Sequence, residues 1–225
     1  MDLAALEKSE LFVRLDARAL KAVKAGAQVK RIRAGSLLLK QGDGANHLFC
    51  VVSGRFKMTT VSKEGAEKTL RFMEPGDAIG CAAVFKGFPY PATATAVVDS
   101  ESASWSAAQF QELMRNHPQI AANALAMVGE RAEQMLQRVR EVTSEPADRR
   151  IAKAVLRLLA QQKEKESGNG ELHISGQELA ELSDTTLFTV SRAIATWKRD
   201  GIVTGGRNRL HVTVPAKLME IAGEG

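Results

Sequence analysis

The stretch from Ile174 to Arg199 predicts two short helices joined by a tight turn, and it constrains the fold more than any other part of the chain. Ser175-Gly176-Gln177-Glu178 has the form of a capping box, in which the Ser hydroxyl and the Glu carboxylate bond to amide groups at a helix start. We therefore expect a first helix from about Ser175 to Leu182. Ser183-Asp184-Thr185 supplies turn-forming residues, and Thr186 can cap a second helix that runs to about Arg199.

The second helix has two chemically opposite faces. At about 100° per residue, an apolar face collects Val190, Ala193, Ile194 and Trp197. The other face collects Leu187, Phe188, Ser191, Arg192, Ala195, Lys198 and Arg199. Hydroxyl, guanidinium and ammonium groups beside an exposed phenyl ring suit the major groove of DNA better than a merely solvated surface. This face is the candidate DNA-binding surface.

A hairpin follows the two helices. Residues 201–214 alternate apolar and polar side chains around Gly205-Gly206, which is typical of a β-hairpin. The helices and the hairpin together predict a winged helix-turn-helix. The alternative is a packed helical hairpin without a ligand. The charges disfavour it, since one acidic residue, Asp200, stands between residues 186 and 214 against the basic residues Arg192, Lys198, Arg199, Arg207 and Arg209.

Length and composition favour two domains and exclude a membrane protein. A chain of 225 residues is long for one core, and 44% hydrophobic content lets each of two domains bury apolar surface. There is no run of about 18 apolar residues, and segment 1–8 is acidic and amphipathic, unlike a signal peptide. We expect a cytoplasmic protein without membrane contacts. The net charge of +5 and the pI near 9.3 favour a polyanionic partner.

The two cysteines, Cys50 and Cys81, are expected to be reduced and buried as small hydrophobic side chains. A redox-sensitive thiol at Cys81 is the alternative.

The N-terminal half predicts a β-domain. After short helices between about Leu3 and Val23, short apolar runs alternate with Gly- and Pro-containing turns. The expected strands are 28–32, 36–40, 47–52, 55–61, 67–73 and 92–105. This pattern favours a double-sheet jelly roll over a βαβ fold. The fold class is therefore α+β: a β-roll (double-stranded β-helix) sensor domain, a long helix and a winged helix-turn-helix.

A helix with a heptad seam connects the two parts. Its apolar positions alternate spacings of four and three along Ala121, Leu125, Val128, Ala132, Met135, Val139 and Val142. The stripe is narrow, which favours pairing with the same helix of a second subunit, although packing on its own domain would also explain it. Ser144-Glu145-Pro146 interrupts the helix and is the expected hinge. We expect a sensor domain at 1–117, a dimerisation helix at 118–143 and a DNA-binding domain at 144–225.

In this order of parts the chain resembles the CRP/FNR family of bacterial transcription regulators. Four motifs carry the resemblance over nearly the whole chain: Gly35-Ser36-Leu37-Leu38-Leu39-Lys40-Gln41-Gly42-Asp43, Val52-Ser53-Gly54-Arg55, Glu74-Pro75-Gly76-Asp77-Ala78-Ile79-Gly80, and Thr189-Val190-Ser191-Arg192. The resemblance implies sequence-specific binding of double-stranded DNA by a homodimer, an effector site in the β-roll, and contact with RNA polymerase.

The chain departs from the family pattern at the effector site. Members that bind cyclic nucleotides carry Glu after the Gly of the phosphate-binding segment and an Arg-Ser or Arg-Thr pair about ten residues later. Here Cys81 follows Gly80, and the later stretch reads Phe88-Pro89-Tyr90-Pro91-Ala92-Thr93. Without these anchors cyclic AMP is disfavoured. An iron-sulfur cluster is also disfavoured, because no Cys precedes Cys50. The effector, and any cofactor, is unidentified; its candidate pocket is Gly80, Cys81, Ala82, Pro91, Ala92 and Thr93.

A second departure lies in the recognition helix, where many members place Glu at the position of Phe188. The operator must therefore differ in part. Arg192 can donate two hydrogen bonds to a guanine, Ser191 can bond a base edge or a phosphate, and Phe188 can contact a thymine methyl. Packing of Phe188 against the wing or hinge is the alternative. Phosphate contacts are assigned to Thr186, Thr189, Arg207 and Arg209.

Other functions have less support. The four histidines are scattered and form no metal-binding or nucleophile–base motif, so we expect no enzyme and no metal site. Haem ligation by His47, His117 or a cysteine is an alternative that rests only on the ability of these residue types to bind haem iron. A pure ligand-binding module would share the β-roll but would not need residues 149–214. A constitutive repressor without an effector is a further alternative, because the pocket lacks its polar anchors.

Overall fold

The computed structural model describes residues 4–62, 65–164, 171–206 and 208–224. The chain forms two compact units, Met1–Gln134 and Met135–Gly225. The division falls within one helix, α5 (Pro118–Ser144). Among the described residues, no helix is long and apolar enough to cross a lipid bilayer.

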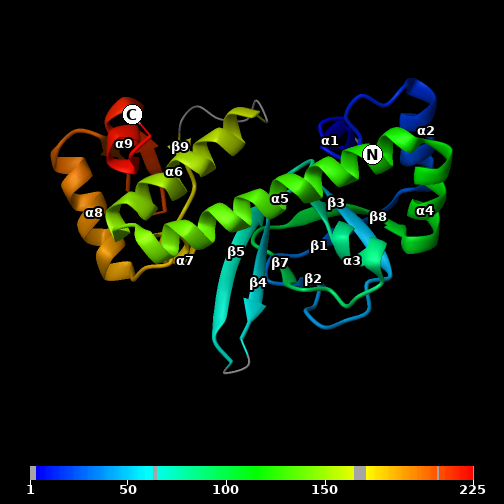
Figure 1. Cartoon of the computed structure of the whole chain (residues 1–225), viewed down its shortest axis with the longest axis horizontal. Coiled ribbons are helices and arrows are strands. Elements are labelled where there is room, and N and C mark those ends of the chain that lie inside the picture. Colours follow the sequence, from blue (N-terminus) through cyan, green and yellow to red (C-terminus); the bar gives the residue numbers. More distant parts are fainter. Residues whose placement is uncertain (1–3, 63–64, 165–170, 207, 225) are drawn as a thin grey trace. The chain divides into compact units, whose positions relative to one another are not determined.

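The first unit is built on two antiparallel four-stranded sheets (Figure 1). One sheet has the order β1 (Gln28–Ile32), β8 (Ser100–Ser106), β3 (His47–Ser53) and β6 (Ala78–Ile79). The other has the order β2 (Leu37–Leu39), β7 (Thr93–Ala96), β4 (Phe56–Val61) and β5 (Glu67–Met73). Apart from the hairpin of β4 and β5, neighbours in the sheets are not consecutive in the sequence, as in a β-roll. The expected jelly-roll architecture is confirmed.

Helices gather at one end of the strands in Figure 1: α1 (Ala4–Glu7), α2 (Ala17–Gly26) and α4 (Ala107–Asn116). Local capping defines where they begin. The Asp16 carboxylate accepts a hydrogen bond from the Ala19 amide at 2.7 Å, and Ser106 with Gln109 forms a complete capping box. The N-terminal part of α5 belongs to the same unit and buries Ile120, Ala124 and Met127 in its core.

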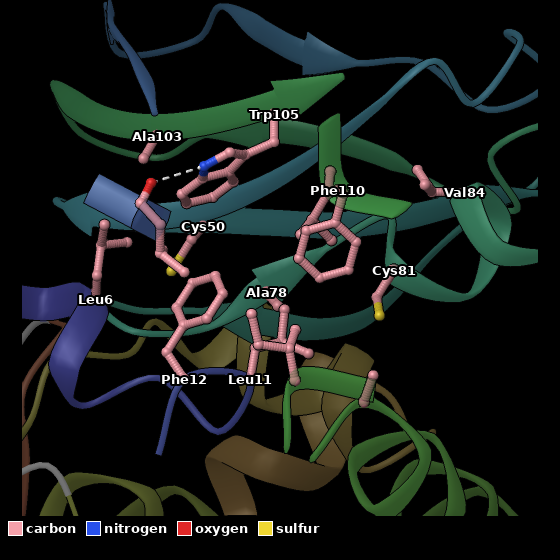
Figure 2. Packing of buried hydrophobic residues seen from close by; sticks show 14 of the residues in the cluster. Leu6, Leu11, Phe12, Cys50, Ala78, Cys81, Val84, Ala103, Trp105 and Phe110 are labelled. Atoms are coloured by element: carbon pink, nitrogen blue, oxygen red, sulfur yellow. Dashed lines mark hydrogen bonds between the residues drawn. The ribbon is translucent and has the colours of Figure 1, made fainter. Parts of the chain in front are cut away.

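Trp105 is a member of a hydrophobic core of this unit (Figure 2). Its side chain is fully buried, and its indole N–H donates to the carbonyl oxygen of Val23 at 3.0 Å. Phe12 meets the indole edge-on with ring centroids 5.4 Å apart. Residues from α1, α2, β3, β8 and α5 thus share one core. Aromatic side chains of this size contribute much of the apolar area that stabilises a core.

The second unit contains the last turns of α5 and a small helical domain with a three-stranded sheet. Its helices are α6 (Ala147–Glu164), α7 (Gly176–Leu182), α8 (Leu187–Arg199) and α9 (Pro215–Ala222). The sheet has the order β10 (Val203–Thr204), β11 (Leu210–Val212) and β9 (Glu171–Leu172), with both pairs antiparallel. The predicted helix-turn-helix with its hairpin is confirmed, and β9 adds a third strand.

Several elements differ from the expectation. The predicted strand 92–105 is two strands, β7 and β8, because residues 97–99 leave the sheet. There the Asp99 carboxylate accepts a hydrogen bond from the Ala34 amide at 2.8 Å. Val97 and Val98 are apolar but exposed, and this hid the turn in the sequence pattern. The pattern also missed β6, α3 (Cys81–Lys86), α4 and α9.

Candidate nucleic-acid interface

Helix α8 is held from behind by its apolar side. Val190, Ala193 and Trp197 are at most 5% exposed, and Ile194 is half-buried. At its start, the Thr186 hydroxyl accepts a hydrogen bond from the Thr189 amide at 3.2 Å. The preceding helix α7 begins with the expected capping box, in which the Ser175 amide donates to the Glu178 carboxylate at 2.7 Å. Both predicted helix starts are therefore confirmed.

The opposite side of α8 is open. Phe188 is 76% exposed and Leu187 is 47% exposed. Also exposed are Ser191, Arg192, Ala195, Lys198 and Arg199, while Thr189 is half-buried. The predicted division of the helix into two faces is confirmed, and the alternative in which Phe188 packs against the wing or hinge is wrong. The exposed apolar pair of Leu187 and Phe188 thus lies on the same helix as the exposed basic residues.

The wing is shaped by Gly205 and by a lysine of α8. Gly205 has φ +126°, and a Cβ there would collide with the carbonyl oxygen of Arg209. The Lys198 ammonium donates to the carbonyl oxygen of Gly205 at 2.9 Å. Lys198, which the sequence assigned to DNA contact, thus links the recognition helix to the wing.

Two further cations of the set lie beside carboxylates. Nε of Arg209 is 3.7 Å from Oε1 of Glu171, and Nε of Arg199 is 3.6 Å from Oδ1 of Asp200. Both arginine side chains stay more than 60% exposed, so these pairs are weak. Arg207 lies outside the described residues.

The heptad seam of α5 is mostly uncovered. Leu125 is 76%, Met135 65% and Val139 57% exposed, and Ala121 and Ala132 are also exposed. Val128 differs, because it is half-buried against the core of the first unit. The side chain of Val142 lies outside the described residues. Leu136 was not part of the predicted seam, but it is 63% exposed and widens the apolar stripe.

The candidate effector residues do not share one environment. Gly80 has φ +85°, and a Cβ there would lie 2.9 Å from the Tyr90 ring. Cys81 and Ala92 are buried, whereas Ala82 and Pro91 are exposed. The Thr93 hydroxyl accepts a hydrogen bond from the Gln41 amide at 3.0 Å.

Both cysteines are free thiols in the first unit, and Cys81 packs near Val84 and Phe110 (Figure 2). Cys81 is 1% exposed. Burial raises the pKa of its thiol to about 12, which keeps it protonated and unreactive at neutral pH. The expectation that the cysteines are buried, unbridged side chains is confirmed.

The structure adds two residues of the sensor region that the sequence did not indicate. The Tyr90 hydroxyl donates to the carbonyl oxygen of His47 at 2.6 Å and accepts from the His47 amide at 3.1 Å. Nη2 of Arg131 in α5 donates to the carbonyl oxygen of Ala78 at 3.0 Å. Burial, and secondly the charge of Arg71, lowers the pKa of Arg131. Both residues bond backbone groups, so no sequence pattern marks them.

His47 and His117 belong to the first unit, and His173 and His211 belong to the second, at the antiparallel pair of β9 and β11. His47 is exposed near Phe49, and His117 caps the end of α4. His117 also lines a polar cleft with Asp16, Arg18, Ala22 and Asn116. Among the described residues, no group of three or more His, Cys, Asp or Glu is placed to hold a metal ion.

Comparisons with known proteins match both parts of the chain. The family model of the cyclic nucleotide-binding domain matches residues 29–117. The family model of the Crp-like helix-turn-helix domain matches residues 149–221. The cyclic AMP receptor protein of Thermus thermophilus is 31% identical over 189 residues, which cover 84% of this chain and 85% of that protein.

Solved structures agree with this match. The catabolite activator protein of Thermus thermophilus aligns over 96% of this chain and 100% of its own, with 28% identity and a TM-score of 0.57. FixK2 from Bradyrhizobium japonicum aligns over 87% of this chain and 96% of its own, with 19% identity and a TM-score of 0.77, and shares the fold. Together with the exposed face of α8, these matches show that the chain belongs to the CRP/FNR family of transcriptional regulators, which are DNA-binding proteins and not enzymes.

Proposed function

We propose that this regulator acts in the cytoplasm as a homodimer on a pseudo-palindromic operator. The observation that carries the proposal is the open face of α8, on which Phe188 is 76% exposed while Val190 and Trp197 are buried behind it. A helix anchored in this way can enter a major groove without losing its packing. The family relatives make RNA polymerase a further expected partner.

The first turns of α8 are proposed to read bases. The N-terminal residues of a recognition helix reach base edges in helix-turn-helix proteins. Arg192 would donate two hydrogen bonds to a guanine, Ser191 would bond a base edge or a phosphate, and Phe188 would contact a thymine methyl.

The residues around this face are proposed to bind phosphates. Thr186 and Thr189 lie at the start of α8, where amide groups and hydroxyls favour anions. Arg209 in the wing, and Arg207 two residues before it in the sequence, would contact the neighbouring DNA backbone, with Arg199 at the end of the helix. Lys198 takes part indirectly, since its ammonium is bound to the wing at Gly205. Phosphate contacts of this kind position the protein and do not distinguish sequences.

The heptad seam is proposed as the dimer interface. Leu125, Met135 and Val139 would be covered, together with Ala132, Val128 and Val142. Solvent exposure of such a stripe on one helix is costly, and a second copy of the helix removes the cost by knobs-into-holes packing.

We propose that cyclic AMP does not regulate this chain, although the Thermus thermophilus relative is named a cyclic AMP receptor protein. Cys81 and the pair Pro91-Ala92 stand where the family pattern places its anchors. None of these side chains carries a charge, and Cys81 is buried. A cyclic phosphate needs a cation beside it. Calorimetric titration with cyclic AMP should show no binding in the micromolar range; micromolar or tighter affinity would overturn this part of the proposal.

The signal is proposed to act on the β-roll segment 80–95 and to change the packing of the helices 118–143. A thiol sensor at Cys81 has less support, because burial raises the pKa of the thiol to about 12. A haem sensor is an alternative, and the absorption spectrum of protein from haem-supplied cells tests it. A constitutive repressor without an effector is another alternative, and genome-wide binding with and without stresses tests it.

Binding to mutated operators tests the assignment of α8. Arg192→Ala should cost about 1–3 kcal/mol at one base pair per half-site and relax the preference there. Arg209→Ala should weaken all sequences alike and flatten the salt dependence. An Arg192→Ala protein with an unchanged sequence preference would refute the assignment.

A further inference from the structure

The link between α5 and the DNA-binding helices is bound together by charged side chains, although its sequence predicted a hinge. Glu141, in the last turns of α5, is buried. Both oxygens of its carboxylate accept hydrogen bonds from Nη1 of Arg157, at 2.9 and 2.7 Å. Nζ of Lys153 donates to Oε1 of Glu145 at 2.7 Å and lies 4.0 Å from Oε1 of Glu141. Two acidic groups before Pro146 are thus paired with two basic groups of α6.

Arg150 connects this link to the turn of the helix-turn-helix. Its guanidinium donates from Nη1 to the carbonyl oxygen of Glu145 at 2.7 Å. Nε donates to the carbonyl oxygen of Ser183 at 3.0 Å, and Nη2 donates to the carbonyl oxygen of Asp184 at 2.9 Å. One planar group therefore bonds the segment between α5 and α6 and the turn between α7 and α8. All these residues belong to the second unit.

The geometry of a guanidinium makes this connection stiff. Its donors lie in one plane at fixed angles, so three simultaneous bonds fix the relative position of the three acceptors. The turn needs such support at Asp184, which has φ +53° and is therefore in the left-handed region that residues with a Cβ rarely adopt. The Ser183 hydroxyl bonds to the carbonyl oxygen of Leu179 at 2.6 Å and fixes the other side of the turn.

We propose that Arg150, with the pair of Glu141 and Arg157, is a clasp that holds the last turns of α5 and the recognition helix as one rigid body. The inference rests on the proposed function, in which two recognition helices read two half-sites. Arg150 is then a positioning residue that contacts no DNA. It sets the direction in which α8 leaves the end of the dimerisation helix, and so it sets the half-site spacing that the dimer accepts.

Half-site spacing reports on this rigidity directly. One inserted base pair turns one half-site by about 35° relative to the other and moves it by about 3.4 Å. A dimer with stiff links cannot follow this change, whereas a dimer with loose links rotates each DNA-binding domain to meet its half-site. A change that only lowers stability would not alter this discrimination.

The test uses the full-length protein and an operator that the wild-type protein selects from random duplexes. Affinity is measured on that operator, on versions with one base pair inserted or removed between the half-sites, and on a single half-site. Arg150→Met removes the three hydrogen bonds of the guanidinium. Arg150→Lys keeps the positive charge but not the planar set of donors, and Arg149→Met is the matched control. The Arg149 guanidinium lies beside Gly223 and not at the link. Fluorescence of the two tryptophans, Trp105 and Trp197, and circular dichroism check that each variant is folded.

We expect the wild-type protein and Arg149→Met to lose at least about tenfold in affinity on the altered spacings, comparable to a mismatched base pair. Arg150→Met should lose less than about threefold there, Arg150→Lys should be intermediate, and single half-site affinity should be unchanged in all. A folded Arg150→Met protein that keeps wild-type discrimination, or that loses single half-site and full-operator affinity equally, refutes the clasp. If Arg150→Met does not fold, Glu141→Gln decides by the same comparison. Failure of the wild-type protein to select any operator would instead refute the proposed function.

Discussion

The most direct perturbation of the proposed interface is the removal of one methyl group from the DNA. Phe188 is the most exposed aromatic side chain of α8 and carries no polar atom. If its ring covers the C5-methyl group of a thymine, replacing that thymine by deoxyuridine removes the contact and keeps all hydrogen-bonding groups of the base. The substitution therefore isolates the apolar contribution of Phe188.

The expected magnitude follows from the area that one methyl group loses to water. Burial of one such carbon is worth about 0.8 kcal/mol, which is roughly a fourfold change in affinity. A dimer with two half-sites should lose about 1.6 kcal/mol, or roughly 15-fold, when both thymines are replaced. Fluorescence anisotropy at fixed salt, with each thymine of a selected operator replaced in turn, measures this change.

The control is the same series with Phe188→Ala, which should bind the thymine and deoxyuridine operators equally. Met219→Ala is the matched variant, because Met219 is an exposed apolar residue of α9 in the same unit, at 43% exposure. It should keep the full sensitivity. The reasoning is refuted if no thymine in either half-site is sensitive, or if Phe188→Ala shows the same sensitivity as the wild-type protein.

Three further outcomes are expected. Leu125→Glu should convert the dimer into monomers in sedimentation experiments, whereas Val98→Glu, at another exposed apolar position, should not; a dimeric Leu125→Glu protein would contradict the seam. Tyr90→Phe should cost about 1–3 kcal/mol in urea unfolding, because it leaves both backbone groups of His47 without their partner; an unchanged midpoint would contradict this. Cys81 should react with thiol reagents at pH 8 only when the protein unfolds. Since its folded pKa is raised from 9.0 to about 12, the stability that the protonated thiol confers is lost as pH rises from 9 to 12, and Cys81→Ala should flatten that loss.

The sequence predicts the DNA-binding half well because its signals are local. The capping residues Ser175 and Thr186, and the spacing of Val190, Ala193 and Trp197, lie within one or two helical turns of the structures they specify. The β-roll is predicted as an architecture but not strand by strand. Residues 97–99 form a turn although two of them are exposed valines, and α4 follows β8 directly without an intervening Gly or Pro.

The parts of the candidate site that sequence reasoning missed depend on backbone acceptors. Arg150 bonds three carbonyl oxygens, and Arg131 bonds one. A carbonyl oxygen has the same chemistry at every position, so no residue type marks the partner in the sequence. The same holds for Lys198, whose assignment to DNA changed once its bond to the Gly205 carbonyl was known. The segment Ser144-Glu145-Pro146 was likewise expected to be a hinge, because the four charged groups around it could not be paired without the structure.

The contacts that the basic side chains around α8 make also affect the balance between sequence-specific and non-specific DNA binding. Five basic residues per subunit, if all neutralised phosphates, would give a dimer a slope of log affinity against log salt of roughly −9. Arg192 is assigned to a base and Lys198 is bonded to the wing, so the proposed phosphate-binding cations of each subunit are Arg199, Arg207 and Arg209. Six such residues in the dimer should give a slope nearer roughly −5, with sequence preference resting on Phe188, Ser191 and Arg192. Titrations between about 50 and 200 mM salt measure the slope. A value near −9 would mean that Arg192 and Lys198 also neutralise phosphates, which would contradict their assignment to a base and to the wing.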